Sequence, residues 1–169
     1  MGLHWHPAQP GGPAGAEAAN LDALCVAFDR RGDPLETVHP GRPRNVNGSI
    51  VHTGDSPTGA STWDDERIFV FLEALPETAC TVSFVVASAN HRVFADVPGA
   101  SCHISDRVTE HELVRLDLTG AFGPYRACRV ATVRRDTGGW SIAPDAQALN
   151  SVAVTELLSL SATPNSGGT

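Results

Sequence analysis

The sequence lacks three features that mark common classes of protein. It has no excess of basic residues, since 12 Lys and Arg stand against 19 Asp and Glu, for a formal net charge of -7. Because nucleic-acid affinity is built largely from Lys and Arg that neutralise phosphates, no nucleic-acid partner is expected. No apolar run is long enough for a membrane span, and residues 1–7 have neither the positive start nor the apolar stretch of a secretory signal. These absences predict a cytoplasmic protein without membrane insertion.

Signatures of cross-linking and of catalysis are also missing. The four cysteines are widely spaced, form no Cys-x-x-Cys pair and mostly lie in apolar surroundings: Cys25, Cys80, Cys102 and Cys128. We therefore expect buried, reduced thiols. No Gly-x-Ser-x-Gly elbow is present to place a serine nucleophile. The sequence predicts a protein that is not an enzyme.

Three histidines offer an alternative metal site. His91, His103 and His111 lie around the middle of the chain, and Cys102 precedes the second of them. Imidazole and thiolate form a zinc-type ligand set, but this spacing fits no compact zinc motif. We interpret these residues as ordinary loop and strand positions.

The segments that are present favour a mainly all-β fold. Short runs rich in β-branched and aromatic residues are bounded by Gly, Pro, Asp or Asn, which is typical of strands. They cover residues 21–28, 67–73, 80–87, 112–118, 127–134 and 140–143. Apolar residues alternate in 112–118, and residues 136–139 predict a hairpin turn. Strands at short intervals without long helices predict a two-sheet antiparallel β-sandwich with short helices.

The two ends of the chain differ in composition from its middle. Residues 1–19 are rich in Pro, Gly and Ala and predict a flexible arm, and residues 162–169 predict a similar tail. The folded domain is therefore expected over residues 20–161. Near its end, Asp145 could cap a helix that carries four apolar residues. These are Leu149, Val152, Leu157 and Leu158.

The most informative segment is a polar, turn-rich loop over residues 49–66. Asp55 stands near its start, and the acidic run Asp64, Asp65 and Glu66 ends it. Clustered carboxylates repel one another unless a cation lies among them. Ca²⁺, which takes six to eight oxygen ligands, is a suitable cation. The alternative is a solvated loop whose charges only maintain solubility.

Two common loop motifs do not account for this segment. Asp55 and Glu66 have the outer spacing of an EF-hand loop, but Pro57 and Gly59 occupy positions that need side-chain oxygens. The run from residue 54 also approaches a phosphate-binding loop, but Ala60 replaces its lysine. Both motifs are therefore excluded.

The order of several short motifs does resemble a known family. They are Asn20-Leu21-Asp22, Gly48-Ser49-Ile50-Val51-His52-Thr53-Gly54-Asp55, Thr58-Gly59, Asp64-Asp65-Glu66 and the strand Ile68-Phe69-Val70. This order resembles the TerD-type domain of tellurium-resistance and stress-response proteins. The resemblance implies a two-sheet β-sandwich whose acidic loops bind Ca²⁺ and which has no established catalytic activity. It implies five ligands, namely Asp22, Asp55, Asp64, Asp65 and Glu66.

The chain also departs from the family pattern. Asn20 and Ser56 replace an aspartate and an asparagine, and Thr62 and Trp63 fall in a stretch that is usually Gly-Asp-Gly. Less charge is then available to two Ca²⁺ ions, which leaves one weak site or a metal-free loop as alternatives. Three hypotheses follow: a calcium-binding module that contacts a protein partner in the stress response, a metal-independent interaction domain, or a metal-dependent hydrolase.

Overall fold

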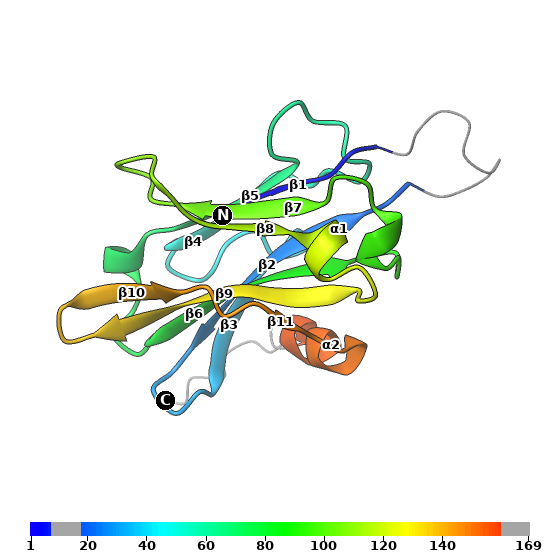
Figure 1. Ribbon diagram of the computed structural model, residues 1–169. Coiled ribbons are helices and arrows are strands. Elements are labelled where there is room, and N and C mark those ends of the chain that lie inside the picture. The colour runs from blue at the N-terminus through cyan, green and yellow to red at the C-terminus, as the bar shows by residue number, and fades with distance from the viewer. Residues whose placement is uncertain (8–17, 160–169) are drawn as a thin grey trace.

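Two antiparallel sheets stack face to face (Figure 1), which confirms the predicted sandwich. The computed structural model describes residues 1–7 and 18–159. The upper sheet in Figure 1 has five strands in the order β4 (Ile50–Thr53), β5 (Glu66–Val70), β1 (Gly2–His4), β7 (Ser101–Ser105) and β8 (Glu112–Asp117). The lower sheet runs β10 (Gly139–Ala143), β9 (Ala127–Asp136), β6 (Thr81–Ser88), β2 (Leu21–Phe28) and β3 (Pro34–Val38), and β11 (Gln147–Ala148) pairs with β9.

The six predicted strands are all present, and β2 has the predicted bounds. β5 ends earlier than expected because the chain turns into the short 3₁₀ helix η1 (Leu72–Ala74). The predicted turn joins β9 to β10, where Gly139 pairs with Asp136. Further 3₁₀ and α turns, η2 (Phe94–Asp96) and α1 (Leu118–Ala121), connect the later strands. The short strands β3, β4 and β7 were not predicted, because polar residues fill about half of each.

The N-terminus corrects the prediction of an arm over residues 1–19. β1 lies in the middle of the five-stranded sheet, between β5 and β7. Leu3 and Trp5 are fully buried in the core between the sheets, so the domain begins well before residue 20. A strand of three residues gives no periodic signal, and only its position between two neighbours buries it. Residues 8–17 and the predicted tail, 162–169, lie outside the described residues.

The predicted helix near the C-terminus is present as α2 (Ser151–Ser159), but its first residues differ from the prediction. Asn150 Oδ1, and not Asp145, accepts a hydrogen bond from the Ala153 amide at 2.8 Å. Asp145 instead accepts one from the Thr132 hydroxyl at 3.0 Å. The helix packs on the outer face of the six-stranded sheet through Val154, Leu157 and Leu158, and Leu149, just before the helix, packs on the same face. Val152, the other apolar residue that the predicted helix carries, is 63% exposed.

The cysteines agree with the expectation of reduced thiols. All four are free, and Cys25, Cys102 and Cys128 are buried. Burial raises the pKa of Cys25 and of Cys102 to about 12. Cys80 is half-buried. No helix in the described part of the chain is both long enough and apolar enough to cross a membrane.

Candidate metal centre

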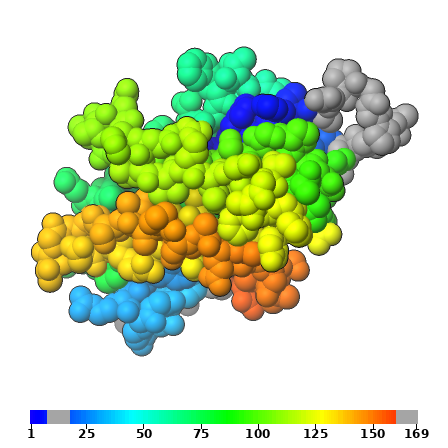
Figure 2. All heavy atoms as spheres, in the orientation of Figure 1, coloured from blue at the N-terminus to red at the C-terminus, as the bar shows by residue number. Residues whose placement is uncertain are grey.

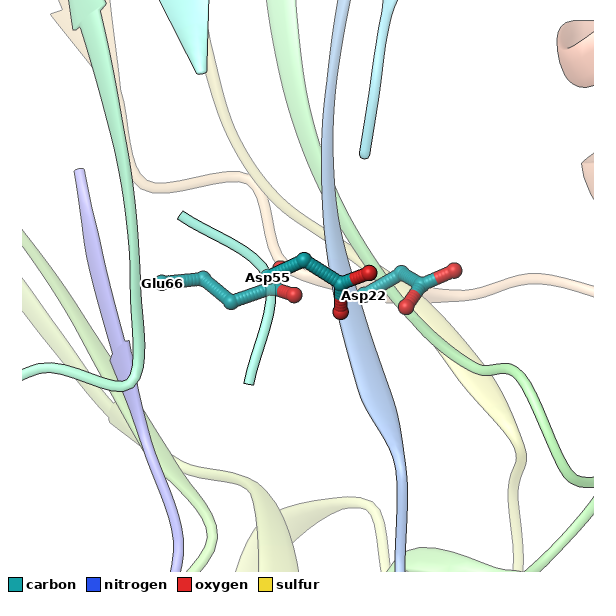
Figure 3. A group of neighbouring side chains, drawn as sticks. All are labelled: Asp22, Asp55 and Glu66. Carbon is teal, nitrogen blue, oxygen red and sulfur yellow. The ribbon is translucent and has the colours of Figure 1, made fainter. Parts of the chain in front are cut away.

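Three carboxylates meet where the two sheets approach each other. Asp22 is the second residue of β2 in the six-stranded sheet, and Glu66 is the first residue of β5 in the five-stranded sheet. Asp55 comes from the loop between β4 and β5 and lies between the other two (Figure 3). One carboxylate oxygen from each residue lies within 4.8 Å of the others. Both sheets and the acidic loop therefore contribute to one site.

Glu66 is the buried member of this group. Its side chain is 0% exposed. Oε2 accepts a hydrogen bond from the Ala23 amide at 2.7 Å and lies 3.2 Å from Nε2 of His52. Oε1 is also buried and has no hydrogen-bond partner among the described residues. A buried carboxylate oxygen without a partner is costly, and a cation held by the three carboxylates would satisfy it. The residues present therefore fit a hard cation such as Ca²⁺.

The electrostatics of Asp22 indicate mutual repulsion within the group. Burial, followed by the nearby carboxylates of Glu66 and Asp55, raises the pKa of Asp22 to about 6. Each of these effects disfavours the charged form of the side chain. At neutral pH, the three carboxylates destabilise one another when no cation is bound.

Burial and this repulsion together predict that Asp22→Asn stabilises the metal-free protein above neutral pH. A carboxyl group whose pKa is raised in the folded state contributes stability below its unfolded pKa and loses it as the pH rises through the folded value, here about 6. Allowing for partial solvent screening, we expect the substitution to raise the free energy of unfolding by about 1 kcal/mol near pH 8 and by almost nothing near pH 4. Urea unfolding of chelator-treated protein at both pH values measures the difference.

Asp64→Asn is the matched control, because it removes the same charge outside the group. Asp64 Oδ2 accepts a hydrogen bond from Nε of Arg67 at 2.9 Å, and this partly exposed ion pair contributes little to stability. A pH-independent effect of Asp22→Asn would contradict a raised pKa of Asp22 in the folded protein.

The other two predicted ligands lie outside the group. Asp65 has a buried carboxylate that accepts hydrogen bonds from the Trp5 amide at 3.0 Å, the Ser61 amide at 3.0 Å and the Ser56 hydroxyl at 3.2 Å. Asp64 faces Arg67 and lies 3.7 Å from Nδ1 of His103. The structure thus brings Asp22, Asp55 and Glu66 together and gives Asp64 and Asp65 other partners.

The departures from the family pattern have distinct surroundings. Ser56 takes part in the hydrogen bonds around Asp65. The side-chain oxygen of Asn20 is buried without a partner among the described residues. Trp63 is 76% exposed, so its ring does not cover the loop. It is available for contact with another molecule.

Sequence reasoning missed one residue of the site, His52. It lies on β4, and its side chain is 1% exposed against Glu66. The available signal was the alternation Ile50-Val51-His52-Thr53, which places His52 on the same face as the buried Ile50. Among the described residues, His91, His103 and His111, which were considered as an alternative zinc site, form no metal-binding group with Cys102.

Comparison with known proteins finds relatives along most of the chain. The family model described as TerD domain matches residues 1–159. The chain is 34% identical over 145 residues to tellurium resistance protein TerZ of Serratia marcescens, covering 83% of this chain and 74% of that protein. It is 32% identical over 133 residues to general stress protein 16U of Bacillus subtilis (strain 168), covering 75% and 69%.

A solved structure is similar to the whole fold. It is the crystal structure of a homologue of telluride resistance protein TerD from Streptomyces coelicolor A3(2), with a TM-score of 0.80 and 22% identity over 96% of both chains. At this identity the likeness supports the fold of the sandwich.

Proposed function

The chain belongs to the TerD domain family, and from that premise we propose that it is a non-catalytic, calcium-binding interaction module of the bacterial response to tellurium and other stress. The observation that carries the calcium proposal is the buried, unpartnered Oε1 of Glu66 beside Asp22 and Asp55. Three carboxylates supply charge for one divalent ion, and carbonyl oxygens and water complete the coordination of Ca²⁺ in such sites.

Calcium rather than magnesium suits this arrangement. The three ligands come from two different sheets and a loop, so their oxygens are not held in one rigid frame. Mg²⁺ requires near-ideal octahedral geometry at short distances, whereas Ca²⁺ accepts longer and less regular coordination. We therefore expect a response that is selective for Ca²⁺.

The bound ion would act structurally. It would join the loop over residues 54–65 to β2 and offset both the burial and the repulsion that raise the pKa of Asp22. The same loop carries the exposed Trp63, which is suited to a protein partner because an aromatic ring buries a large apolar area on contact. Calcium would thus fix the surface that the partner contacts.

A second candidate is a metal-independent interaction domain on the same scaffold. The observation that favours it is the buried carboxylate of Asp65, which accepts hydrogen bonds from the amides of Trp5 and Ser61 and so already has protein partners. In this alternative the loop already has its final shape, and Ca²⁺ has no effect on stability.

A thermal melt of chelator-treated protein with and without excess Ca²⁺ separates the two candidates, with Mg²⁺ as the control. Ligand at about 100 times its dissociation constant stabilises the folded state by about 2.7 kcal/mol. At this chain length the midpoint should rise by roughly 5–10 °C. Asp55→Ala should abolish the rise, because it removes one of the three converging carboxylates.

Asp64→Ala is the matched control for this experiment, since Asp64 lies outside the group. It should retain the calcium response. Loss of the response in both variants would point to the larger ligand set that the family resemblance implies. No response in the unmodified protein would favour the metal-independent domain.

A further inference from the structure

The N-terminal segment carries two histidines on the side that faces away from the core. Leu3 and Trp5 are fully buried between the sheets. His4 and His6 alternate with them along the chain, and the first is half-buried and the second exposed. Successive side chains of an extended segment point to opposite sides, so both imidazoles lie on the outer side. Figure 2 shows this dark blue segment at the surface, between the blue-green loop that precedes β5 and the green β7.

The imidazole rings of His4 and His6 are direct neighbours. Their ring centres lie 5.5 Å apart, and the two ring planes are inclined by 73°. Two imidazole nitrogens that bind one ion at about 2.1 Å, with tetrahedral geometry, place their ring centres roughly 5–6 Å apart. The separation of the two rings therefore matches that of two imidazoles that share one metal ion.

The surroundings of His4 decide which of its nitrogens faces outward. Nδ1 is buried and lies 2.9 Å from Oδ2 of Asp65. The two atoms are close without being aligned as a hydrogen bond, but a carboxylate at this distance favours the tautomer with its proton on Nδ1. The lone pair is then on Nε2. A carboxylate beside the other ring nitrogen is typical of metal-bound histidines, because it orients the ring and raises its basicity.

His6 is held beside His4 by the segment that precedes β7. Its amide donates a hydrogen bond to the carbonyl oxygen of Pro98 at 2.9 Å. A Cβ atom at Gly99 would lie 2.8–3.0 Å from Cε1 and both ring nitrogens of His6, so the imidazole packs directly on this glycine. The fold thus positions both rings before any ion binds, which lowers the entropic cost of binding.

We propose that His4 and His6 bind a divalent transition-metal ion of the kind that prefers nitrogen ligands, such as Zn²⁺ or Cu²⁺. Imidazole suits these ions, whereas Ca²⁺ takes oxygen ligands. Water completes the coordination on the exposed side of the pair. The site uses none of the three carboxylates of the acidic group, so it is independent of the calcium proposal.

The first test is a calorimetric titration of the full chain with Zn²⁺, in excess Ca²⁺ that competes for the carboxylates. Cys80→Ser is the common background, because the half-buried thiol of Cys80 is a competing zinc ligand. We expect saturable binding of one ion per chain. His6→Ala should weaken binding about tenfold or more, because a single imidazole cannot chelate the ion.

His111→Ala is the matched control, since it removes another exposed histidine that lies outside the pair. This variant should bind Zn²⁺ as the background protein does. His4→Gln should weaken binding as His6→Ala does, and a thermal melt verifies that each variant is folded. Equal weakening in His6→Ala and His111→Ala would overturn the proposal, as would the absence of saturation in the background protein.

Electron paramagnetic resonance of Cu²⁺, added at less than one equivalent, provides a second readout because it detects nitrogen ligands directly. We expect coupling to two imidazoles in the background protein and in His111→Ala, and to no more than one in His6→Ala. Asp55→Ala should keep both, because Asp55 belongs to the acidic group. A spectrum with oxygen ligands alone, or one that changes in Asp55→Ala and not in His6→Ala, would contradict a histidine site.

Discussion

Replacing Asp65 with alanine is expected to lower the free energy of unfolding by about 3–5 kcal/mol. The carboxylate is buried and accepts hydrogen bonds from the amides of Trp5 and Ser61 and the hydroxyl of Ser56. Nδ1 of His4 lies 2.9 Å from the same side chain. Removal of the Asp65 carboxylate leaves at least one buried amide, that of Trp5, without a partner. The loss in the free energy of unfolding should be nearly the same with and without Ca²⁺.

Urea unfolding of Asp65→Ala and of the unmodified protein, once with calcium and once with chelator, measures the loss in the free energy of unfolding under both conditions. Asp55→Ala is the comparison, because Asp55 belongs to the converging group and should cost stability only when Ca²⁺ is present. If Asp65 is itself a metal ligand, as the family resemblance implies, its cost would instead grow on addition of calcium. Asp65→Asn, which retains an acceptor oxygen, should recover part of the loss in either condition.

The strands that could be predicted are those that carry their own signal. β2 is a run of apolar residues with the predicted bounds, and β9 to β10 is defined by its glycine-containing turn. β1 could not be predicted, since Leu3 and Trp5 are surrounded by residues typical of a linker. Its place between β5 and β7 is fixed by long-range pairing, such as Leu3 with Glu66 and with Cys102. No local propensity encodes such pairing.

The site was harder to predict than the fold, for a geometric reason. Of the run Asp64, Asp65 and Glu66, only Glu66 belongs to strand β5, whereas the other two residues end the preceding irregular loop, so the three carboxylates point in different directions. The structure divides them accordingly, with Glu66 beside Asp22 and Asp55 and the other two among different donors. Asp22 and Asp55 are far from each other in sequence, and no spacing rule joins them. The family resemblance predicted that Asp22 and Asp55 share a role as metal ligands. Only the packing of the two sheets brings them close together.

Trp5→Ala is expected to be as destabilising as the loss of Asp65, with a cost of about 3–5 kcal/mol. Trp5 is 0% exposed, and its Nε1 donates to the carbonyl oxygen of Ala19 at 3.1 Å. It also supports the acidic loop, because Gly59 packs directly on the indole ring. A Cβ atom at Gly59 would lie 2.3 Å from that ring, and the φ angle of Gly59 is +67°, where a side chain is strained. Removing the ring therefore opens a cavity beneath the loop that carries Asp55.

Two measurements distinguish support of the acidic loop by Trp5 from a general loss of stability. The thermal midpoint of Trp5→Ala should fall by roughly 10 °C or more, whereas Trp63→Ala should change the free energy of unfolding by no more than about 0.5 kcal/mol. The control is apt because Trp63 is 76% exposed on the same loop. Calcium affinity, measured at a temperature where both variants are folded, should fall in Trp5→Ala and be retained in Trp63→Ala. If Trp5→Ala kept full calcium affinity, the loop would be positioned by the hydrogen bonds of Asp65 alone, and the indole would contribute only to the core.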